Sequence, residues 1–452
     1  MRLVKRIVKR LAIGFCAVVF LLCVLGVVGF YRGLTPLPTP PPGVRLQPPL
    51  PPISRQDLKP DNAAFYYAKA VDLFHGYEQS NESKSQMEAV VAGEVSGNTK
   101  AVERTLADCH EALDLCRKGT QASFCEMPSL DYTTNSTAFV SPLRQLARLL
   151  VAEGKLAEQT GETDKAISNY LAVVTLGRDC SRGGPIIYSL VGDAIIGIGA
   201  QSTRAFMLQK VPSPEEARYV MDKLDQIQME STPFADTLRY ELADAKEIMD
   251  RDMFERLKWG QKIASHRAIF CTFDAAYGEL IQDADKPFWE SRAKTITEEW
   301  VQSAKPRVLC AINRPVAHIM LGMMLPAIQS PRIKAVRADL EFEATRVVCA
   351  LKSYQLTHDT PPEQLADLVP TFLPSVNIDP FDGKPLRYRR EGKEWVIWSV
   401  GSDLKDDNAA WHEFKYRKRG EERAGGDIFF KSTEPQDDLA YYLSQKDSKD
   451  KR

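Results

Sequence analysis

Acidic and amide side chains gather in one short segment near the C-terminal end of the chain. They are Asp403, Asp406, Asp407 and Asn408, and Asp427 follows just before the apolar residues 428–430. Calcium takes about six to eight oxygen ligands from carboxylates, carbonyls and water. The segment therefore predicts a calcium site. Lys405 and the basic residues 415–419 oppose it, so a solvated acidic turn is the alternative.

A small antiparallel sheet is expected to hold this loop. Asp379-Pro380 starts a turn, and Asp382-Gly383 indicates a hairpin because glycine accepts positive φ. Residues 386–390 alternate apolar and polar side chains, as a half-buried strand does. Residues 395–400 are rich in aromatic and β-branched types and form the expected partner strand. The acidic residues thus follow the second strand.

Helices are expected before this sheet. Residues 339–356 carry apolar side chains at helical spacing, and Pro361-Pro362 lies just beyond their end. Residues 363–368 form a short second helix. The predicted order is therefore a long helix, a short helix and a small antiparallel sheet.

Taken together, these motifs resemble the C-terminal module of the major pseudopilin of type II secretion. The counterparts of the family's motifs are Tyr354, Pro361-Pro362, residues 379–388 and residues 399–403, so the resemblance covers about residues 335–430. It implies a helix on a small sheet and a calcium-holding loop. The pseudopilin leader is absent, and residues 404–408 replace the glycine-rich part of the loop. The chain is therefore more similar to large anchored proteins in which such a module follows a helical domain.

A helical hairpin is predicted at residues 141–179. Ser141-Pro142 is typical of an N-cap followed by proline at the first helical position. The hairpin resembles a tetratricopeptide unit, with small or ring-bearing residues at the family's spacings: Gly154, Gly161, Ala166 and Tyr170. The small residues would let the two helices approach closely, with Tyr170 between them. An ordinary helical hairpin is the alternative.

Further helices are expected in the same part of the chain. Asp61 is expected to cap the first helix, and residues 100–117 form another. The apolar residues 186–200 predict a buried helix, because the segment is too short to span a bilayer and contains Asp193. Residues 213–216 form a capping box, and residues 232–259 form a long amphipathic helix.

The composition argues against several classes of function. The 452 residues are 44% hydrophobic and 26% charged, which is ordinary for a globular protein of two or three domains. The net charge of −1 argues against nucleic acid as the main partner. The sequence has no Gly-x-Ser-x-Gly elbow, P-loop, paired-histidine zinc helix or Cys-x-x-Cys pair. Free, buried cysteines are the favoured interpretation of the cysteine pattern, and pairing of some of them stays open.

The N-terminal part predicts a membrane anchor. Residues 11–31 contain no charged residue and are long enough to cross a bilayer as one helix. Five lysines and arginines precede them, so the positive-inside rule places the N-terminus in the cytoplasm. A cleaved signal peptide is the alternative, but no Ala-x-Ala-like site follows the apolar run. The proline-rich residues that follow predict a stiff spacer.

The predicted fold class is mainly α. It combines a single N-terminal transmembrane helix, a helical ectodomain and a small α+β C-terminal module with an antiparallel sheet. The predicted parts are a cytoplasmic basic segment (1–10), the transmembrane helix (11–31), a proline-rich linker (32–60), a helical domain (61–330), the pseudopilin-like helix plus β module (331–435) and a polar tail (436–452).

These features indicate a protein of the inner (plasma) membrane whose bulk is periplasmic or extracellular. The expected function is a non-catalytic interaction or scaffolding role at the cell envelope. The expected partners are membrane lipid, through the anchor, and a protein, but no nucleic acid. One alternative is an extracytoplasmic hydrolase with no recognisable local motif, since catalytic residues are often far apart in sequence. The other is an accessory component of a secretion system. Whether the protein is an enzyme stays open.

Overall fold

The computed structural model describes a defined set of residues, on which all structural statements below rest. They are residues 38–75, 85, 99–129, 139–210, 213–251, 266–303, 320–322, 324–325, 328–409 and 426–432. The expected cytoplasmic segment 1–10, the expected transmembrane helix 11–31 and the expected tail 436–452 lie outside them. The anchor and its orientation therefore stay predictions.

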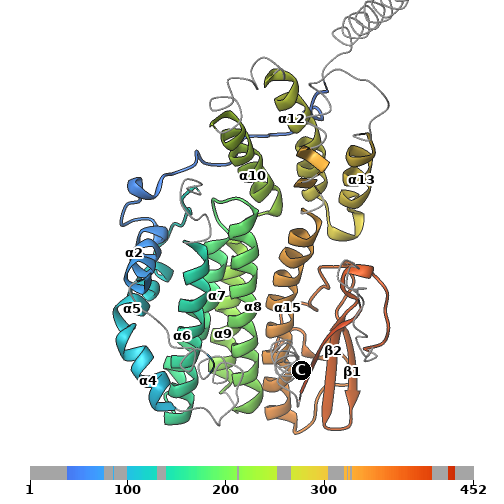
Figure 1. Cartoon of the computed structure of the whole chain (residues 1–452). Helices are drawn as coiled ribbons and strands as arrows, with labels where there is room; N and C mark the ends of the chain where they lie inside the picture. The colour runs from blue at the N-terminus through green and yellow to red at the C-terminus, as the bar shows by residue number, and fades with distance from the viewer. Residues whose placement is uncertain are drawn as a thin grey trace, which may run out of the picture. The chain divides into compact units, whose positions relative to one another are not determined.

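The described residues are mainly helical and include one small antiparallel sheet (Figure 1). This confirms the coarse fold class expected from the sequence. The α-helices are α2 (Ala63–His75), α4 (Thr99–Asp108), α5 (His110–Thr120), α6 (Val140–Thr160), α7 (Thr163–Cys180), α8 (Ile186–Gln209), α9 (Pro214–Met229), α10 (Phe234–Ile248), α12 (His266–Ala284), α13 (Ala293–Ser303) and α15 (Gln329–His358). The strands are β1 (Arg387–Glu391), β2 (Glu394–Ser399) and β3 (Ile428–Lys431), and short 3-10 helices are η1 (Arg55–Asp57), η3 (Phe288–Glu290), η5 (Leu365–Leu368) and η6 (Gly401–Asp403).

The chain divides into two compact units. As far as its residues are described, the first lies within Met1–Leu46, Ala245–Asp283 and Arg292–Gln329. In it, the indole N–H of Trp300 on α13 donates to Glu279 on α12 at 3.2 Å. The second unit lies within Gln47–Asp244, Ala284–Ser291 and Ser330–Arg452. It holds the helices from α2 to α9, α15 and the sheet. The domain bounds expected from the sequence stay predictions.

The core of the second unit is built on close helix contacts. A Cβ added to Gly154 of α6 would lie 2.5 Å from Cε1 of the buried Tyr170 on α7. A Cβ on Gly177 of α7 would lie 2.6 Å from the backbone nitrogen of Ile196 on α8. The close approach of the hairpin helices around Tyr170, expected from the sequence, is confirmed. Gly161 ends α6 in the left-handed region at φ 79°, as its place in the turn requires.

Helix α8 is the one described helix whose length and composition would let it cross a membrane. Half of its most apolar window is buried inside the protein, and core helices of soluble proteins pass the same test. Tyr188, Ile195 and Phe206 of this helix lie in the core formed with α6 and α7. The sequence-based expectation of a buried helix at residues 186–200 agrees with this burial.

Two helix starts differ from the sequence prediction. α6 begins at Val140, so Ser141 lies inside the first turn and caps nothing. The start of α2 is capped by Asn62 instead of Asp61: its side-chain oxygen accepts from the Ala64 N–H at 3.0 Å. The same amide donates to the Glu126 carbonyl at 2.9 Å. This contact with a residue distant in sequence explains why Asn62, and not Asp61, caps the helix.

One predicted helix is interrupted, the end of another lies outside the described residues, and one cap is confirmed. The helix expected at residues 100–117 is broken at Cys109, where the His110 ring approaches the Ala107 carbonyl at 2.7 Å. The helix expected at 232–259 begins at Phe234 and is described as far as Arg251. At α9 the structure confirms the capping box: the Ser213 hydroxyl accepts from the Glu216 N–H, and the Glu216 carboxylate accepts from the Ser213 N–H.

The α15 helix has two buried faces. Ala338, Phe342 and Cys349 belong to the core shared with α6, α7 and α8. Other residues of the same helix, Leu340, Ala344, Val347 and Leu351 among them, belong to a second core with the sheet residues Trp395, Ile397 and Phe430. The helix expected at 339–356 therefore exists and starts earlier, and the short helix expected at 363–368 is the 3-10 helix η5.

The sheet has the strand order β1-β2-β3, and both pairings are antiparallel. Glu391 pairs with Glu394 across the first turn, and Gly392 in that turn has φ +70°. The two strands expected from the sequence are confirmed. β3 adds the residues that follow Asp427 to the far side of β2, which places the acidic loop between β2 and β3 in the chain.

Candidate functional site

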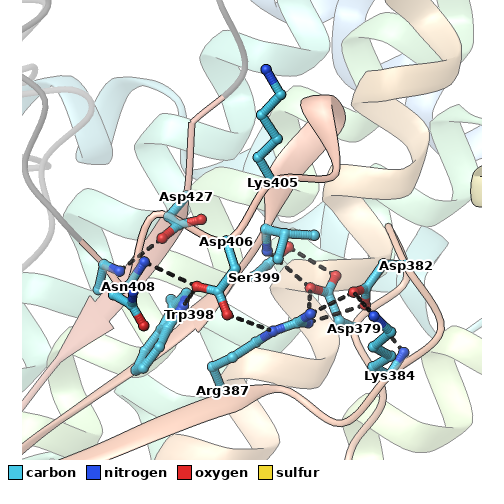
Figure 2. Close-up of polar contacts among 12 residues, drawn as sticks. Asp379, Asp382, Lys384, Arg387, Trp398, Ser399, Lys405, Asp406, Asn408 and Asp427 are labelled. Atoms are coloured by element: carbon cyan, nitrogen blue, oxygen red, sulfur yellow. Dashed lines mark hydrogen bonds and ion pairs between the residues drawn. The ribbon is translucent and has the colours of Figure 1, made fainter.

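The loop after β2 is fastened to the sheet by an acidic side chain (Figure 2). Oδ1 of Asp406 accepts from the indole N–H of Trp398 on β2 and from the backbone N–H of Asn408, both at 2.9 Å. The backbone of this loop needs residues in the left-handed region, at Gly401, Leu404 and Asn408. Gly401 also has no room for a side chain, since an added Cβ would lie 2.5 Å from the Gly426 carbonyl oxygen.

A single guanidinium joins three carboxylates beside this loop. Arg387 of β1 donates from Nη1 to Asp379 at 2.9 Å and to Asp382 at 3.0 Å. Its second terminal nitrogen also donates to Asp382, and its Nε lies 3.6 Å from Asp406. We call Asp379, Asp382, Arg387 and Asp406 the Arg387 cluster (Figure 2). It links the turn before β1, the strand itself and the loop after β2.

Asp379 is the buried member of the Arg387 cluster, with a side chain that is 0% exposed. Besides Arg387, it accepts from the Phe381 N–H at 3.0 Å, the Ser399 hydroxyl at 2.8 Å and the Val400 N–H at 3.0 Å. Burial raises the pKa of Asp379 above its ordinary value, and these donors oppose that rise. Four donors saturate the carboxylate, so it holds structure and has no lone pair placed for acid–base chemistry.

The two other carboxylates of the cluster have pKa values shifted the opposite way. Burial acts to raise the pKa of Asp382, but the hydrogen bonds and charge of Arg387 and the Lys384 N–H outweigh it and lower the pKa. Burial likewise acts to raise the pKa of Asp406, and the Trp398 indole, the Asn408 N–H and Arg387 lower it. Both side chains are therefore firmly held as carboxylates.

The structure brings together some of the five predicted calcium ligands. Asp406 and Asp407 lie close enough to Asp427 for their charges to act on it. Burial raises the pKa of Asp427 first, the Ala409 N–H opposes this rise, and the charges of Asp406 and Asp407 add to it. One Asp427 oxygen accepts from Ala409 at 2.7 Å, while the other is buried without a hydrogen-bond partner among the described residues.

The other two predicted ligands are Asp403 and Asn408, and each forms a hydrogen bond that involves the backbone. Asp403 accepts from the Lys405 N–H at 3.1 Å. Asn408 accepts on its backbone carbonyl from Arg389 at 3.1 Å. The Lys405 side chain extends away from the Arg387 cluster (Figure 2). It therefore does not lie between these carboxylates.

Sequence reasoning did not identify Arg387 as the positive charge at this site. In the strand it occupies a polar position of the alternating pattern and looks like a solvated side chain. A signal exists in retrospect: two aspartates lie eight and five residues before it, on the other side of a Gly-containing turn. Among the described residues, no group of three or more His, Cys, Asp or Glu side chains is arranged to hold a metal ion. A calcium site at residues 403–427 stays a prediction.

The described cysteines are all free. Cys109, Cys116, Cys125, Cys180 and Cys349 are buried, and Cys271 is half-buried. Burial raises the pKa of Cys109 to about 11 and that of Cys116 to about 12. These thiols are protonated and act as small apolar side chains, in line with the expectation from the sequence.

Comparison with known proteins returns no relative. No family model, no curated protein and no solved structure matches this chain significantly.

Proposed function

We propose that the chain is a membrane-anchored, extracytoplasmic protein that binds a protein partner and performs no chemistry on it. The observation that carries this proposal is the state of the charged side chains in the C-terminal module. In the Arg387 cluster, the guanidinium donates hydrogen bonds to the carboxylates of Asp379 and Asp382, and Asp379 also accepts from Ser399 and Val400. These bonds hold the turn, the strand and the start of the loop together. Residues held in this way make a rigid support for exposed segments.

The segment that this support presents is the hairpin tip, which we define as residues 391–394. All four residues are exposed, and Arg389 just before them is exposed too. Gly392 sits in open space, since an added Cβ would meet no atom within 4 Å. The tip carries charges of both signs, Glu391, Lys393 and Glu394, on a rigid two-stranded base. Charged side chains in such a place act on partner selection and association rate more than on affinity.

The remaining support for the proposal comes from the sequence. The uncharged residues 11–31 behind a basic segment provide the anchor. The likeness of residues 335–430 to the pseudopilin module agrees with a role at the cell envelope. A role as an accessory component of a secretion system stays an alternative, and no feature of the described structure favours it.

Site-specific photo-crosslinking in intact membranes tests the proposed function. A photoreactive residue replaces Lys393 in the hairpin tip, and a matched variant carries it at the exposed Asp222 of α9. We expect a protein adduct of discrete mass from position 393 that is absent from position 222. Identical adduct patterns at the two positions, or no adduct at either, would contradict a partner at the hairpin tip.

A further inference from the structure

The outer edge of β1 carries backbone groups that no described part of the chain uses. β1 is an edge strand, because the strand order is β1-β2-β3 (Figure 1). On β2, Trp395 directs its backbone toward β3: its carbonyl accepts from the Ser432 N–H at 3.1 Å, and its N–H donates to the Ser432 hydroxyl at 3.2 Å. Its partner in β1 is Arg390, which therefore directs its own N–H and carbonyl away from β2.

The same alternation gives Tyr388 an outward-facing N–H and carbonyl, since it lies two residues before Arg390. Among the described residues, neither of them has a backbone hydrogen bond on this side. Their side chains are held elsewhere: the Tyr388 hydroxyl donates to the Pro362 carbonyl at 2.6 Å, and Arg390 pairs with Glu363. β1 therefore offers a short row of backbone donors and acceptors to an extended chain alongside it.

The chain itself shows that this edge accepts an extended backbone. Just before β1, the Leu386 N–H donates to the Asn377 carbonyl at 3.0 Å. Beside them, Ile378 and Pro385 form an isolated antiparallel bridge. Leu386 lies two residues before Tyr388, so its N–H is on the same outer side. In the described structure, the bridge is not continued along the five residues of β1, so the ladder stops where a second chain can extend it.

The charges along β1 favour an acidic segment as the added strand. β1 contains three arginines and one glutamate. Arg387 is matched by the carboxylates of the Arg387 cluster, which leaves Arg389 and Arg390. Their ion-pair partners, Glu391 and Glu363, are 49% and 81% exposed, and exposed ion pairs contribute little to stability. Carboxylates on a neighbouring strand can therefore replace them, and cross-strand pairs of opposite charge stabilise a sheet.

A second copy of the chain fits this edge less well. Two β1 strands can pair antiparallel around a two-fold axis so that Tyr388 of each copy bonds Arg390 of the other. That register places Arg389 directly opposite Arg389 of the second copy. Like charges directly opposite one another destabilise a sheet. The edge is therefore better suited to a different chain that carries the opposite charge.

We propose that the partner adds a strand to this sheet: an extended segment rich in aspartate or glutamate pairs with the outer edge of β1. The inference rests on the proposed function, because it states how the partner of that function binds. Main-chain hydrogen bonds to Tyr388 and Arg390 hold the segment, and its carboxylates meet Arg389 and Arg390. The hairpin tip follows β1 directly, so it lies beside one end of the bound segment.

Photo-crosslinking of the full chain in intact membranes, with the photoreactive residue in place of Lys393, tests this inference in three variants. Arg390→Pro removes the outward N–H, and an edge strand tolerates proline where its nitrogen faces outward. Arg390→Ala removes the same charge but keeps the N–H. Arg389→Glu keeps the backbone and reverses a charge that meets the segment. We expect the yield of partner adduct to fall about tenfold in Arg390→Pro and in Arg389→Glu, and less in Arg390→Ala.

Asp222→Asn on the exposed face of α9 is the control and should keep the wild-type yield. Thermal unfolding of the purified variants verifies that each is folded, and if Arg390→Pro is not, the comparison rests on Arg389→Glu. An undiminished adduct in either folded variant would overturn strand addition and leave the proposed function standing, because a partner would still bind at the hairpin tip. An adduct with the mass of two copies of this chain would overturn the acidic partner in favour of self-association. The absence of any adduct from wild type would contradict the proposed function as well.

Discussion

The guanidinium of Arg387 donates to the fully buried carboxylate of Asp379 at 2.9 Å, across the turn that precedes β1. This pair joins two segments that come together only when the sheet forms. It also orients Arg387 so that its remaining nitrogens face Asp382 and Asp406. The stability of the C-terminal module should therefore depend on this pair more than on any exposed charge.

We expect Asp379→Ala to lower the free energy of unfolding by about 3–5 kcal/mol, because it leaves three buried donors without their acceptor and removes one carboxylate partner of the Arg387 guanidinium. Denaturant unfolding of the full chain measures the loss. Lys393→Ala in the exposed hairpin tip is the control and should change stability little. Equal losses of unfolding free energy from the two substitutions would show that the Arg387 cluster does not stabilise the C-terminal module.

Two helical glycines make a matched pair for a packing prediction. Gly154→Ala forces a methyl group against the Tyr170 ring, which is buried and whose hydroxyl donates to Glu158. We expect a loss of about 1–3 kcal/mol from overpacking. Gly197→Ala meets open space in α8, so it should be neutral or stabilise by up to about 1 kcal/mol through helix propensity. The thermal unfolding midpoints of the two variants rank their stabilities. A Gly154→Ala protein that is more stable than Gly197→Ala would contradict the close contact between Gly154 and Tyr170.

The Arg387 cluster should weaken in acid. The pKa values of Asp382 and Asp406 lie below their ordinary values, so these groups contribute stability above the unfolded pKa that is lost as the pH falls through the folded one. We expect Asp382→Asn to be less stable than wild type at neutral pH and to approach it in strong acid. Unfolding midpoints across an acid series give the comparison. The same difference in unfolding midpoint between wild type and Asp382→Asn at every pH would contradict the lowered pKa of Asp382.

The sequence also predicts calcium at the loop that ends with Asp427. A bound ion would stabilise the folded chain by about 2.7 kcal/mol at one hundred times its dissociation constant. The measurement is the thermal midpoint of the full chain with calcium and then with chelator. Asp427→Asn should abolish the difference, and Asp403→Asn should do the same if Asp403 is also a ligand. Coincident midpoints with calcium and with chelator would leave an acidic turn with no ion.

The anchor predicted at residues 11–31 is tested on the mature protein. We expect its N-terminus to precede residue 11 and the protein to stay with membranes after alkaline extraction, because an uncharged segment of this length crosses a bilayer. N-terminal sequencing identifies the first residue. A mature chain that begins after residue 31 would favour the cleaved signal peptide instead.

Local signals predicted much of the fold, and contacts distant in sequence account for the differences. The capping box at Ser213 and the turn at Gly161 depend on neighbouring residues, and both are found where the sequence placed them. Asn62 replaced Asp61 as a cap because it also bonds Glu126, which lies 64 residues away. Such a partner cannot be recognised from the residues around the helix start.

The candidate site was predictable to a smaller extent. The strands and the acidic loop between them follow from alternation and turn residues, as β1 and β2 confirm. The role of Arg387 did not follow, since a charged residue at a polar strand position is usually solvated. Its partners are set by the turn at Asp382 and by the return of the loop to Trp398, which are tertiary features.

The two buried faces of α15 make the helices and the sheet of this unit a single cooperative folding unit. Cutting the chain near residue 330 would expose Ala338, Phe342 and Cys349 to water, so the C-terminal module should be insoluble when expressed alone. For the same reason, the amides of α7 and those of β2 should exchange in one global opening event, with equal free energies. Any partner that binds the sheet would then stabilise the helices on the other side of α15 without contacting them.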